Sequence, residues 1–392
     1  MTMYLASNLR ATPAPALTEL MARVREISSK SRIINLAQAV VDFPPPEPFI
    51  EAVIESIRGD HIHRYSPDPG WLHLRQTLAD YLNRSFGLNV HPENELIITP
   101  GANQACFEAF MSILEPGDEV IIPAPWYFNH AMTVTMLGGI LKAVPAHSRD
   151  DYIPDPERIK DLITEKTRAF VFVNPNNPTG SCYGDDWIRE VGDILADREI
   201  WVISDQTYQE IVFQGGRPLS MASLPGMHEK TVTVGSFSKS LGIAGWRIGF
   251  LAGPDMLVEQ AIKVQDCSII SAPNITQSGL MATLPHLESF REKYLPVLKR
   301  RRDAFCEGIQ ACREIRYTEP QGSIFVFLRL PDSWDEMDFA RHLLEKAGVA
   351  LVPATGFGPG GKGGLRVSFG ATLEKDLVVA AEKIGECVKS YK

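Results

Sequence analysis

Short hydrophobic runs, many of them β-branched, alternate along the middle of the chain with longer segments of helical length. The runs lie at 96–99, 120–122, 170–173, 201–204, 232–234 and 248–251. Continuous apolar strands separated by helices predict a mostly parallel sheet with helices on both faces. Ligands of such sheets bind beyond the carboxyl ends of the strands. We therefore expect the functional residues just after these runs.

Both ends of the chain carry a different pattern. Near the start we predict an arm at 1–14, a helix at 16–30 and a short strand at 33–39, followed by a stiff connector at Pro44–Pro46. Near the end we predict a long helix at 286–312 broken by Pro296, strands at 324–328, 349–352 and 365–369, and helices at 335–347 and 373–390. The expected fold is thus α/β, with a large domain at 46–290. A smaller α+β domain is expected from 291–392 and part of 1–45.

Composition narrows the class of protein. The chain has 392 residues, 44% hydrophobic and 22% charged, with a formal net charge of −9. The negative charge argues against a nucleic-acid partner, and we interpret the basic cluster at 299–302 as a solvated helix face. We expect no secretory leader and no membrane span. Six scattered cysteines match no zinc pattern, so we expect no metal site and a cytoplasmic location with reduced thiols.

The most informative stretch follows the strand at 232–234. Lys239 comes directly after Ser236 and Ser238, and Arg247 follows beyond a glycine-containing turn. A lysine standing alone would be read as a solvated surface charge. Hydroxyls together with a guanidinium supply the donors and the fixed charge of a phosphate cradle. A lysine beside such a cradle indicates a Schiff base with a phosphorylated aldehyde, namely pyridoxal phosphate.

Two ordered strings carry a resemblance to a known family. Ser-Phe-Ser-Lys-Ser…Gly-Trp-Arg-Ile-Gly spans 236–249, and Asn-Pro-Asn-Asn-Pro-Thr-Gly spans 174–180. Both resemble signatures of the fold-type I, class I/II pyridoxal-phosphate aminotransferases, and further motifs match in the family's order over nearly the whole chain. The resemblance implies a homodimer with shared active sites.

The resemblance also implies the catalytic roles. Lys239 would hold the cofactor and then act as general base and acid. Asp205, which could otherwise be a helix N-cap, would keep the pyridine nitrogen protonated. Tyr208 and Asn177 would bind the phenolic oxygen of the ring and lower the basicity of the imine.

Further positions match cofactor contacts of the family. The phosphate cup would comprise Gly101, Ala102, Asn103, Ser236, Ser238 and Arg247. The loop at 101–103 joins a strand to a helix, whose first amides form an anion site. Tyr127 would stack on the ring, and Trp126 could line the substrate pocket instead. Tyr65 either packs on the surface as a loop aromatic or reaches the phosphate of the neighbouring subunit.

On the substrate side, Arg366 would clamp the α-carboxylate bidentately. The chain departs from the family at 37–41, where Ala37-Gln38-Ala39 replaces a Gly-Gln-Gly-like string. Ala39 would line the substrate side, and the added side-chain volume leaves the substrate open. Asn103 occupies a position where some relatives selective for acidic substrates carry lysine, which argues against aspartate as the preferred donor.

The resulting hypothesis is an aminotransferase that moves an α-amino group from an L-amino acid to a 2-oxo acid. One alternative is elimination, replacement or cyclisation on the same scaffold, by a carbon–sulfur lyase or a synthase acting on a sulfonium amino acid. Another is a non-enzymatic amino-acid sensor, which would need a DNA-binding appendage. The string at 356–363 imitates a P-loop, but no Ser or Thr follows Lys362 and a strand comes next. We expect a mobile loop near the substrate entrance there.

Overall fold

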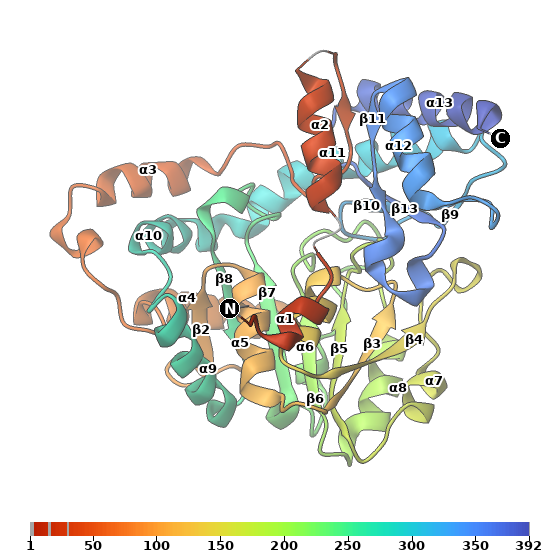
Figure 1. The fold of residues 1–392 in the computed structure, drawn as a ribbon. Helices are drawn as coiled ribbons and strands as arrows, with labels where there is room; N and C mark the ends of the chain where they lie inside the picture. Colours follow the sequence, from red (N-terminus) through yellow and green to blue (C-terminus); the bar gives the residue numbers. More distant parts are fainter. Residues whose placement is uncertain (1–3, 15–16, 30, 392) are drawn as a thin grey trace.

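The fold centres on a seven-stranded sheet (Figure 1). The computed structural model describes residues 4–14, 17–29 and 31–391. The strand order is β2-β8-β7-β6-β5-β3-β4, and only β8 runs antiparallel to its neighbours. The strands are β2 (Leu96–Thr99), β3 (Glu119–Ala124), β4 (Ile140–Pro145), β5 (Thr167–Val173), β6 (Trp201–Asp205), β7 (Thr231–Ser236) and β8 (Gly249–Ala252). The predicted mostly parallel sheet is confirmed.

Helices cover both faces of this sheet because its central strands are apolar on both sides. In β5, Ala169 and Val171 pack with helices α5, α6 and α9, whereas Phe170 and Phe172 pack with α8 on the other face. Helices α4 and α10 cover the β2–β8 end. The helices are α4 (Leu72–Phe86), α5 (Ala102–Ile113), α6 (Phe128–Met136), α7 (Pro156–Asp161), α8 (Asp185–Ala196), α9 (Asp255–Ser268) and α10 (Asn274–Thr283).

A second, smaller sheet lies over the edge of the large one that carries the carboxyl ends of the parallel strands (Figure 1). It is antiparallel in the order β12-β13-β10-β9 and is packed by three helices. Its elements are β9 (Arg316–Tyr317), β10 (Phe325–Arg329), β12 (Val352–Pro353), β13 (Gly364–Ser368), α11 (Leu287–Ile309), α12 (Glu336–Ala347) and α13 (Glu374–Ser390). The predicted smaller α+β unit is therefore present.

The N-terminal segment reaches both parts of the molecule. Within the expected arm, α1 (Ser7–Ala11) lies beside α6 (Figure 1), and residues 1–3 fall outside the described part. Helix α2 (Leu17–Ser28) follows, and β1 (Ile34–Asn35) pairs in parallel with β11 (Val349–Ala350). Helix α3 (Glu47–Ser56) then packs on α10. The two ends of the chain thus meet in one pair of strands.

Three predictions about the C-terminal part need correction. Pro296 does not break α11, because packing of that helix on α13 outweighs the lost backbone hydrogen bond. The cluster at 299–302 is only half solvated: Arg301 is buried against Asp42 at 2.7 Å, and Arg302 is buried against Glu319 at 3.2 Å. The strand expected at 349–352 divides into β11 and β12, which join different sheets.

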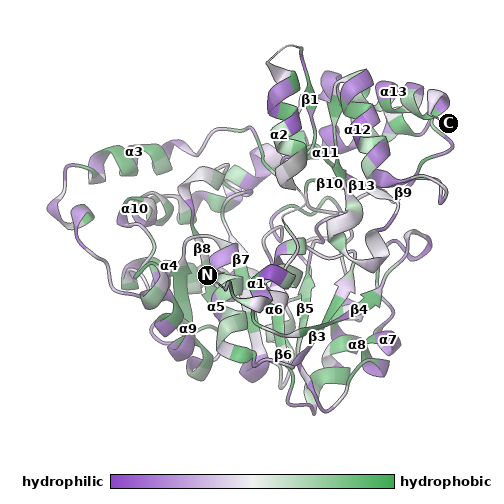
Figure 2. Cartoon of the chain, viewed as in Figure 1, coloured by the Kyte–Doolittle hydropathy of each residue, from purple (hydrophilic) through white to green (hydrophobic). Residues whose placement is uncertain are grey.

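Hydropathy follows this architecture. Figure 2 shows hydrophobic residues gathered in the strands of the large sheet, whereas hydrophilic residues mark the outer sides of the surrounding helices. Among the described helices, none combines the length and the apolar composition that a membrane span needs.

Candidate active site

The site lies where five strands of the large sheet end. Asp205 ends β6, Ser236 ends β7, and Asn177 follows β5. Tyr127 follows β3, and the turn after β2 leads into α5. Carboxyl ends of parallel strands meet at one edge of a sheet, so residues far apart in sequence converge there. The expectation drawn from strand position is met.

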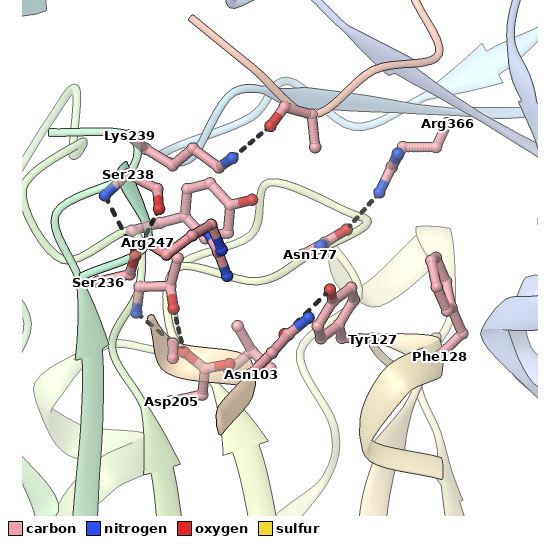
Figure 3. Close-up of a pocket in the computed structure, with 15 residues that line it drawn as sticks. Asn103, Tyr127, Phe128, Asn177, Asp205, Ser236, Ser238, Lys239, Arg247 and Arg366 are labelled. Atoms are coloured by element: carbon pink, nitrogen blue, oxygen red, sulfur yellow. Dashed lines mark hydrogen bonds between the residues drawn. The ribbon is translucent and has the colours of Figure 1, made fainter. Parts of the chain in front are cut away.

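These residues surround a cavity of about 160 Å³. Figure 3 shows Lys239 and Arg366 on one side of it and Asp205 on the opposite side. The cavity brings together most of the predicted site residues: Ala39, Ala102, Asn103, Tyr127, Asn177, Asp205, Tyr208, Ser236, Ser238, Lys239, Arg247 and Arg366.

One end of the cavity is rich in anion donors. Ser236 Oγ donates to Ser238 Oγ at 2.9 Å and accepts from the Ser238 amide at 3.1 Å. Helix α5 begins at Ala102, and its first amides have no acceptor within the helix. Gly101 has φ +90°, and a Cβ placed there would lie 2.7 Å from Arg247 Nη2. The positive φ favours glycine here, and the absence of a side chain lets Arg247 lie against this turn.

Asp205 anchors the opposite end. Its Oδ1 accepts from the Thr207 amide at 3.0 Å and from Thr207 Oγ1 at 2.6 Å. Its Oδ2 lies 3.1 Å from Nε2 of the buried His130, which also contacts Cys106 Sγ at 3.3 Å. Three donors stabilise the negative charge of this buried carboxylate. The Cys106, His130 and Asp205 atoms lie close enough to hold a metal ion, but here they bond to one another.

Lys239 is half-buried beside two other cations. Its Nζ donates to the backbone oxygen of Ala39. Burial lowers the pKa of Lys239 to about 8, and the positive charges of Arg247 and Arg366 act in the same direction. The amine is therefore far more available as a nucleophile and base near neutral pH than an ordinary lysine.

Arg366 comes from β13 of the second sheet and is 1% exposed. Its Nη1 donates to Asn177 Oδ1 and its Nη2 to the Ala37 oxygen, both at 3.0 Å, while Nε has no hydrogen-bond partner among the described residues. Burial lowers its pKa to about 10. The guanidinium lies over Phe325 at 4.5 Å and Phe357 at 5.4 Å. No described carboxylate pairs with it.

Two tyrosines line the same space. Tyr127 donates to Asn103 Oδ1 at 3.3 Å and accepts from Asn129 at 2.8 Å, and burial raises its pKa to about 12. Burial also raises the pKa of Tyr208, which packs edge-on against Phe325. Both phenols therefore stay protonated at neutral pH and can act as hydrogen-bond donors.

Three predicted residues do not line the cavity: Gly101 lies beside Arg247, and the other two lie farther away. Tyr65 is 82% exposed in the single chain. Trp126 is buried beside Gly358 and borders a separate apolar pocket. Sequence reasoning missed four neighbours of the site: Phe128, Val173, Thr207 and His130. His130 offered one signal, since it is a titratable residue within the largely apolar stretch that follows Tyr127.

The segment at 37–41 contacts Lys239 and Arg366 through its backbone oxygens. The carbonyl oxygens of Ala37 and Ala39 accept hydrogen bonds from Arg366 and Lys239. The Ala37 methyl group is fully buried, whereas Ala39 lines the cavity. Replacing glycine by alanine in this string therefore leaves these two carbonyl contacts possible.

The residues present fit pyridoxal phosphate. The anion donors suit a phosphate, the buried carboxylate suits a protonated ring nitrogen, and Lys239 lines the same cavity. The tight cradle of Gly101 against Arg247 is an independent sign of a built phosphate site.

Comparisons with known proteins decide the family. A family model for class I and II aminotransferases matches residues 31–384. The aspartate/prephenate aminotransferase of Thermus thermophilus is 33% identical over 355 residues, which cover 90% of each chain. This chain belongs to the class I and II aminotransferases. The structure of the T. thermophilus aspartate aminotransferase with maleate matches with a TM-score of 0.93 at 31% identity, covering 98% of this chain and all of that one.

A second solved relative differs in the substrate that it is named for. The aromatic aminotransferase of Pyrococcus horikoshii matches with a TM-score of 0.88 at 30% identity, covering 95% of this chain and 99% of that one. This chain is thus a pyridoxal-phosphate-dependent aminotransferase, which moves an α-amino group from an L-amino acid to a 2-oxo acid. The elimination, replacement and cyclisation alternatives are not favoured by these relatives.

Proposed function

We propose that this aminotransferase works through Lys239, with Asp205 and Arg366 fixing the cofactor and the donor. The observation that carries the proposal is a single cavity that is lined by a lysine of lowered pKa, by anion donors and by a buried carboxylate. Ser236, Ser238, Arg247 and the start of α5 would hold the phosphate, and Asp205 the ring nitrogen. Tyr208 and Asn177 would bind the phenolic oxygen, and Tyr127 would stack on the ring.

Bound pyridoxal phosphate supplies an electron sink for the negative charge left when the α-proton of the donor is removed. Lys239 Nζ takes that proton as general base and later returns it as general acid. With a pKa of about 8, the lysine can hold or release the proton near neutral pH. Asp205 stabilises the positive charge on the ring nitrogen, and His130 and Thr207 fix the orientation of its carboxylate.

Arg366 would orient the donor through its α-carboxylate. Its guanidinium faces the cavity and bonds only to neutral oxygens among the described residues. A carboxylate would replace neutral acceptors with a charged, bidentate one. Asn177 touches both the proposed carboxylate clamp and the proposed phenolic oxygen site, so it would couple the position of the donor to that of the ring.

We further infer a donor with an uncharged, apolar or aromatic side chain. The positively charged residues that line the cavity are Lys239, Arg247 and Arg366, and each already has a role. No additional cation of the described chain lines it to receive a side-chain carboxylate, and the ring of Phe128 forms part of the wall. These features support an aromatic or aliphatic donor over aspartate.

The test is a half-reaction with donor alone. Wild-type holoenzyme should release up to one equivalent of 2-oxo acid per site without an acceptor, and phenylalanine or leucine should react at lower concentration than aspartate. Lys239→Ala should show no release, with turnover lowered by several orders of magnitude. Substantial release by Lys239→Ala would remove the central claim. A preference for aspartate would overturn the donor assignment alone.

A homodimer with shared sites is supported by exposed apolar side chains on α3, on α10 and in the loop before α4. Ile54 on α3, Ile57 directly after it, Tyr65 in the following loop and Met281 on α10 are large hydrophobic residues left exposed in the single chain. Exposed apolar side chains on neighbouring elements are typical of a protein interface. Tyr65 would then reach the phosphate site of the partner.

Two coarser proposals complete the description. The six cysteines are all free thiols, which supports a reducing compartment such as the cytoplasm. We propose domain limits near residues 45 and 290. The second limit is supported by α11, which starts beside α10 and continues to the small sheet.

A further inference from the structure

A second polar cleft, of about 950 Å³, lies on the side of the molecule that carries β4 and β9, away from α3 and α10 (Figure 1). Four segments form its walls: the loop after β4, the turn before β9, the end of β10, and the residues around η8 (Pro359–Gly361). None of its lining residues belongs to the cavity that holds Lys239.

The cleft is positively charged although the protein is acidic. Five cations line it, namely Arg149, Arg313, Arg316, Arg329 and Lys362, against the two carboxylates of Glu314 and Asp332. The whole chain carries a formal charge of −9. Among the described residues, Arg313, Arg316 and Lys362 form no ion pair, and Arg149 pairs only with the exposed Asp150.

Two of these arginines are held in an unfavourable arrangement. Arg316 of β9 lies directly opposite Arg329 of β10 in the antiparallel register. Like charges at directly opposed positions destabilise a strand pair. Asp332 relieves this only in part, since it bonds Arg329 at 2.8 Å but is 90% exposed. An anion bound between the two guanidinium groups would offset the repulsion.

The cleft is linked to Arg366 through one stretch of chain. Lys362 supplies a backbone oxygen to Arg329. Glu336 accepts hydrogen bonds from both ends of the segment 355–363, from Thr355 Oγ1 at 3.1 Å and from the Gly363 amide at 3.2 Å. Phe357 in that segment packs on the Arg366 guanidinium. The cleft and the proposed carboxylate clamp thus share one short stretch of chain.

We propose that this cleft binds a multiply charged small anion, either a phosphorylated compound or a polycarboxylate. Arginine forks bind both groups bidentately, and several cations around one space favour a ligand with more than one negative charge. The protein as a whole carries a formal charge of −9, so a long polyanion such as nucleic acid does not fit its overall charge. The proposal does not depend on the roles given to Lys239 or Arg366.

The test is calorimetric titration of holoenzyme with pyrophosphate and, separately, with citrate. We expect saturable binding of one anion per chain, weaker at 150 mM than at 20 mM salt because exposed charges are screened. The double variant Arg316→Gln/Lys362→Gln should raise the Kd about tenfold or more. A control, Lys263→Gln/Arg341→Gln, removes the same charge from exposed helix positions and should bind like wild type.

The stronger of the two probes identifies the anionic group. Loss of its binding only in the Arg316→Gln/Lys362→Gln protein, with cofactor absorbance unchanged, would support the cleft. Equal binding by the double variant and the control would place the anion elsewhere, for example on Arg366, and would overturn the proposal. Absence of binding by both probes would also overturn it.

Discussion

The chemistry of Lys239 depends on neighbours that share its charge. Burial, together with the positive charges of Arg247 and Arg366 in the same cavity, lowers the pKa of its amine to about 8. The two arginines therefore have an effect on Lys239 besides the anion binding that we propose for them. They keep the lysine in a range where it can exchange a proton near neutral pH.

This pKa predicts a pH dependence in the cofactor-free protein. The fraction of free amine at Lys239 should rise as pH passes about 8, instead of near the ordinary lysine value of 10.5. Between these two pH values the unfolded chain binds a proton that the folded chain does not, so this group makes folding more favourable as pH rises. Labelling of the 236–247 peptide by a small amine-reactive reagent, followed by mass spectrometry, measures the midpoint. Arg366→Ala should move it upward; a wild-type midpoint near 10.5 would contradict the assignment.

Variants of Arg366 test the proposed donor clamp separately from cofactor binding. Arg366→Ala should keep normal cofactor absorbance while the apparent affinity for amino donors falls about tenfold or more, because a charge-assisted bidentate contact is lost. The loss should be similar for donors with unlike side chains, since all share the α-carboxylate. Arg366→Lys retains the charge without the planar fork and should recover only part of the affinity.

The apparent affinities are measured by titrating phenylalanine and leucine into the Arg366→Ala and Arg366→Lys proteins. If either donor binds the Arg366→Ala protein as tightly as wild type, its carboxylate lies elsewhere in the cavity.

Many residues that line the cavity could be predicted from the sequence, because they belong to short motifs with a fixed order of residues. Ser236, Ser238, Lys239 and Arg247 line one cavity, as their spacing suggested. His130 was missed because its contact with Asp205 joins positions 75 residues apart, and only the fold brings them together. The Ala37 and Ala39 contacts were missed because they use backbone oxygens, which no side-chain pattern indicates.

At the scale of elements, the junction between β2 and α5 illustrates how a turn positions a ligand site. Gly101 has a positive φ and lies against Arg247. Its conformation therefore favours glycine, and its lack of a side chain leaves space for the arginine. A substitution of Gly101 would change both the backbone strain and the contact with Arg247. A control variant is needed to separate these two effects.

Gly117 provides that control. Gly101→Ala and Gly117→Ala both place a Cβ on a residue of positive φ, +90° and +95°, but nothing lies within 4 Å of the Cβ at 117. Each should lose about 1 kcal/mol of folding stability from strain. Only Gly101→Ala should also raise the Kd for pyridoxal phosphate, about tenfold or more, because Arg247 is displaced. Equal cofactor affinity in the two variants would show that the cradle does not hold the phosphate.

Elements with continuous apolar runs were predicted well, and those governed by tertiary contacts were not. The apolar runs of β5 and β6 coincide closely with the observed strands. Strand β4 escaped notice because it lies at the sheet edge, where its residues are only partly buried and include Lys142. The division of 349–352 into two strands depends on which partner each half finds, and local sequence does not encode this.

At the scale of the whole molecule, the proposed homodimer predicts which subunit supplies Tyr65 to each active site. If Tyr65 serves the partner, a dimer of Lys239→Ala and Tyr65→Ala chains contains one site with both defects and one with none. Such hybrids, isolated with two affinity tags, should regain about half of the wild-type activity, because one of the two sites is intact. Each parent variant should remain impaired. A hybrid no more active than the Tyr65→Ala parent would mean that Tyr65 does not act across the interface.

The unpaired charge of Arg366 also has a practical consequence. The guanidinium is 1% exposed, and its hydrogen-bond partners among the described residues are neutral oxygens. A small carboxylate from the buffer, such as acetate or citrate, can therefore compete for the place of the donor. Michaelis constants measured in such buffers would overstate the true values in proportion to buffer concentration. Carboxylate-free buffers are the conditions in which donors can be ranked.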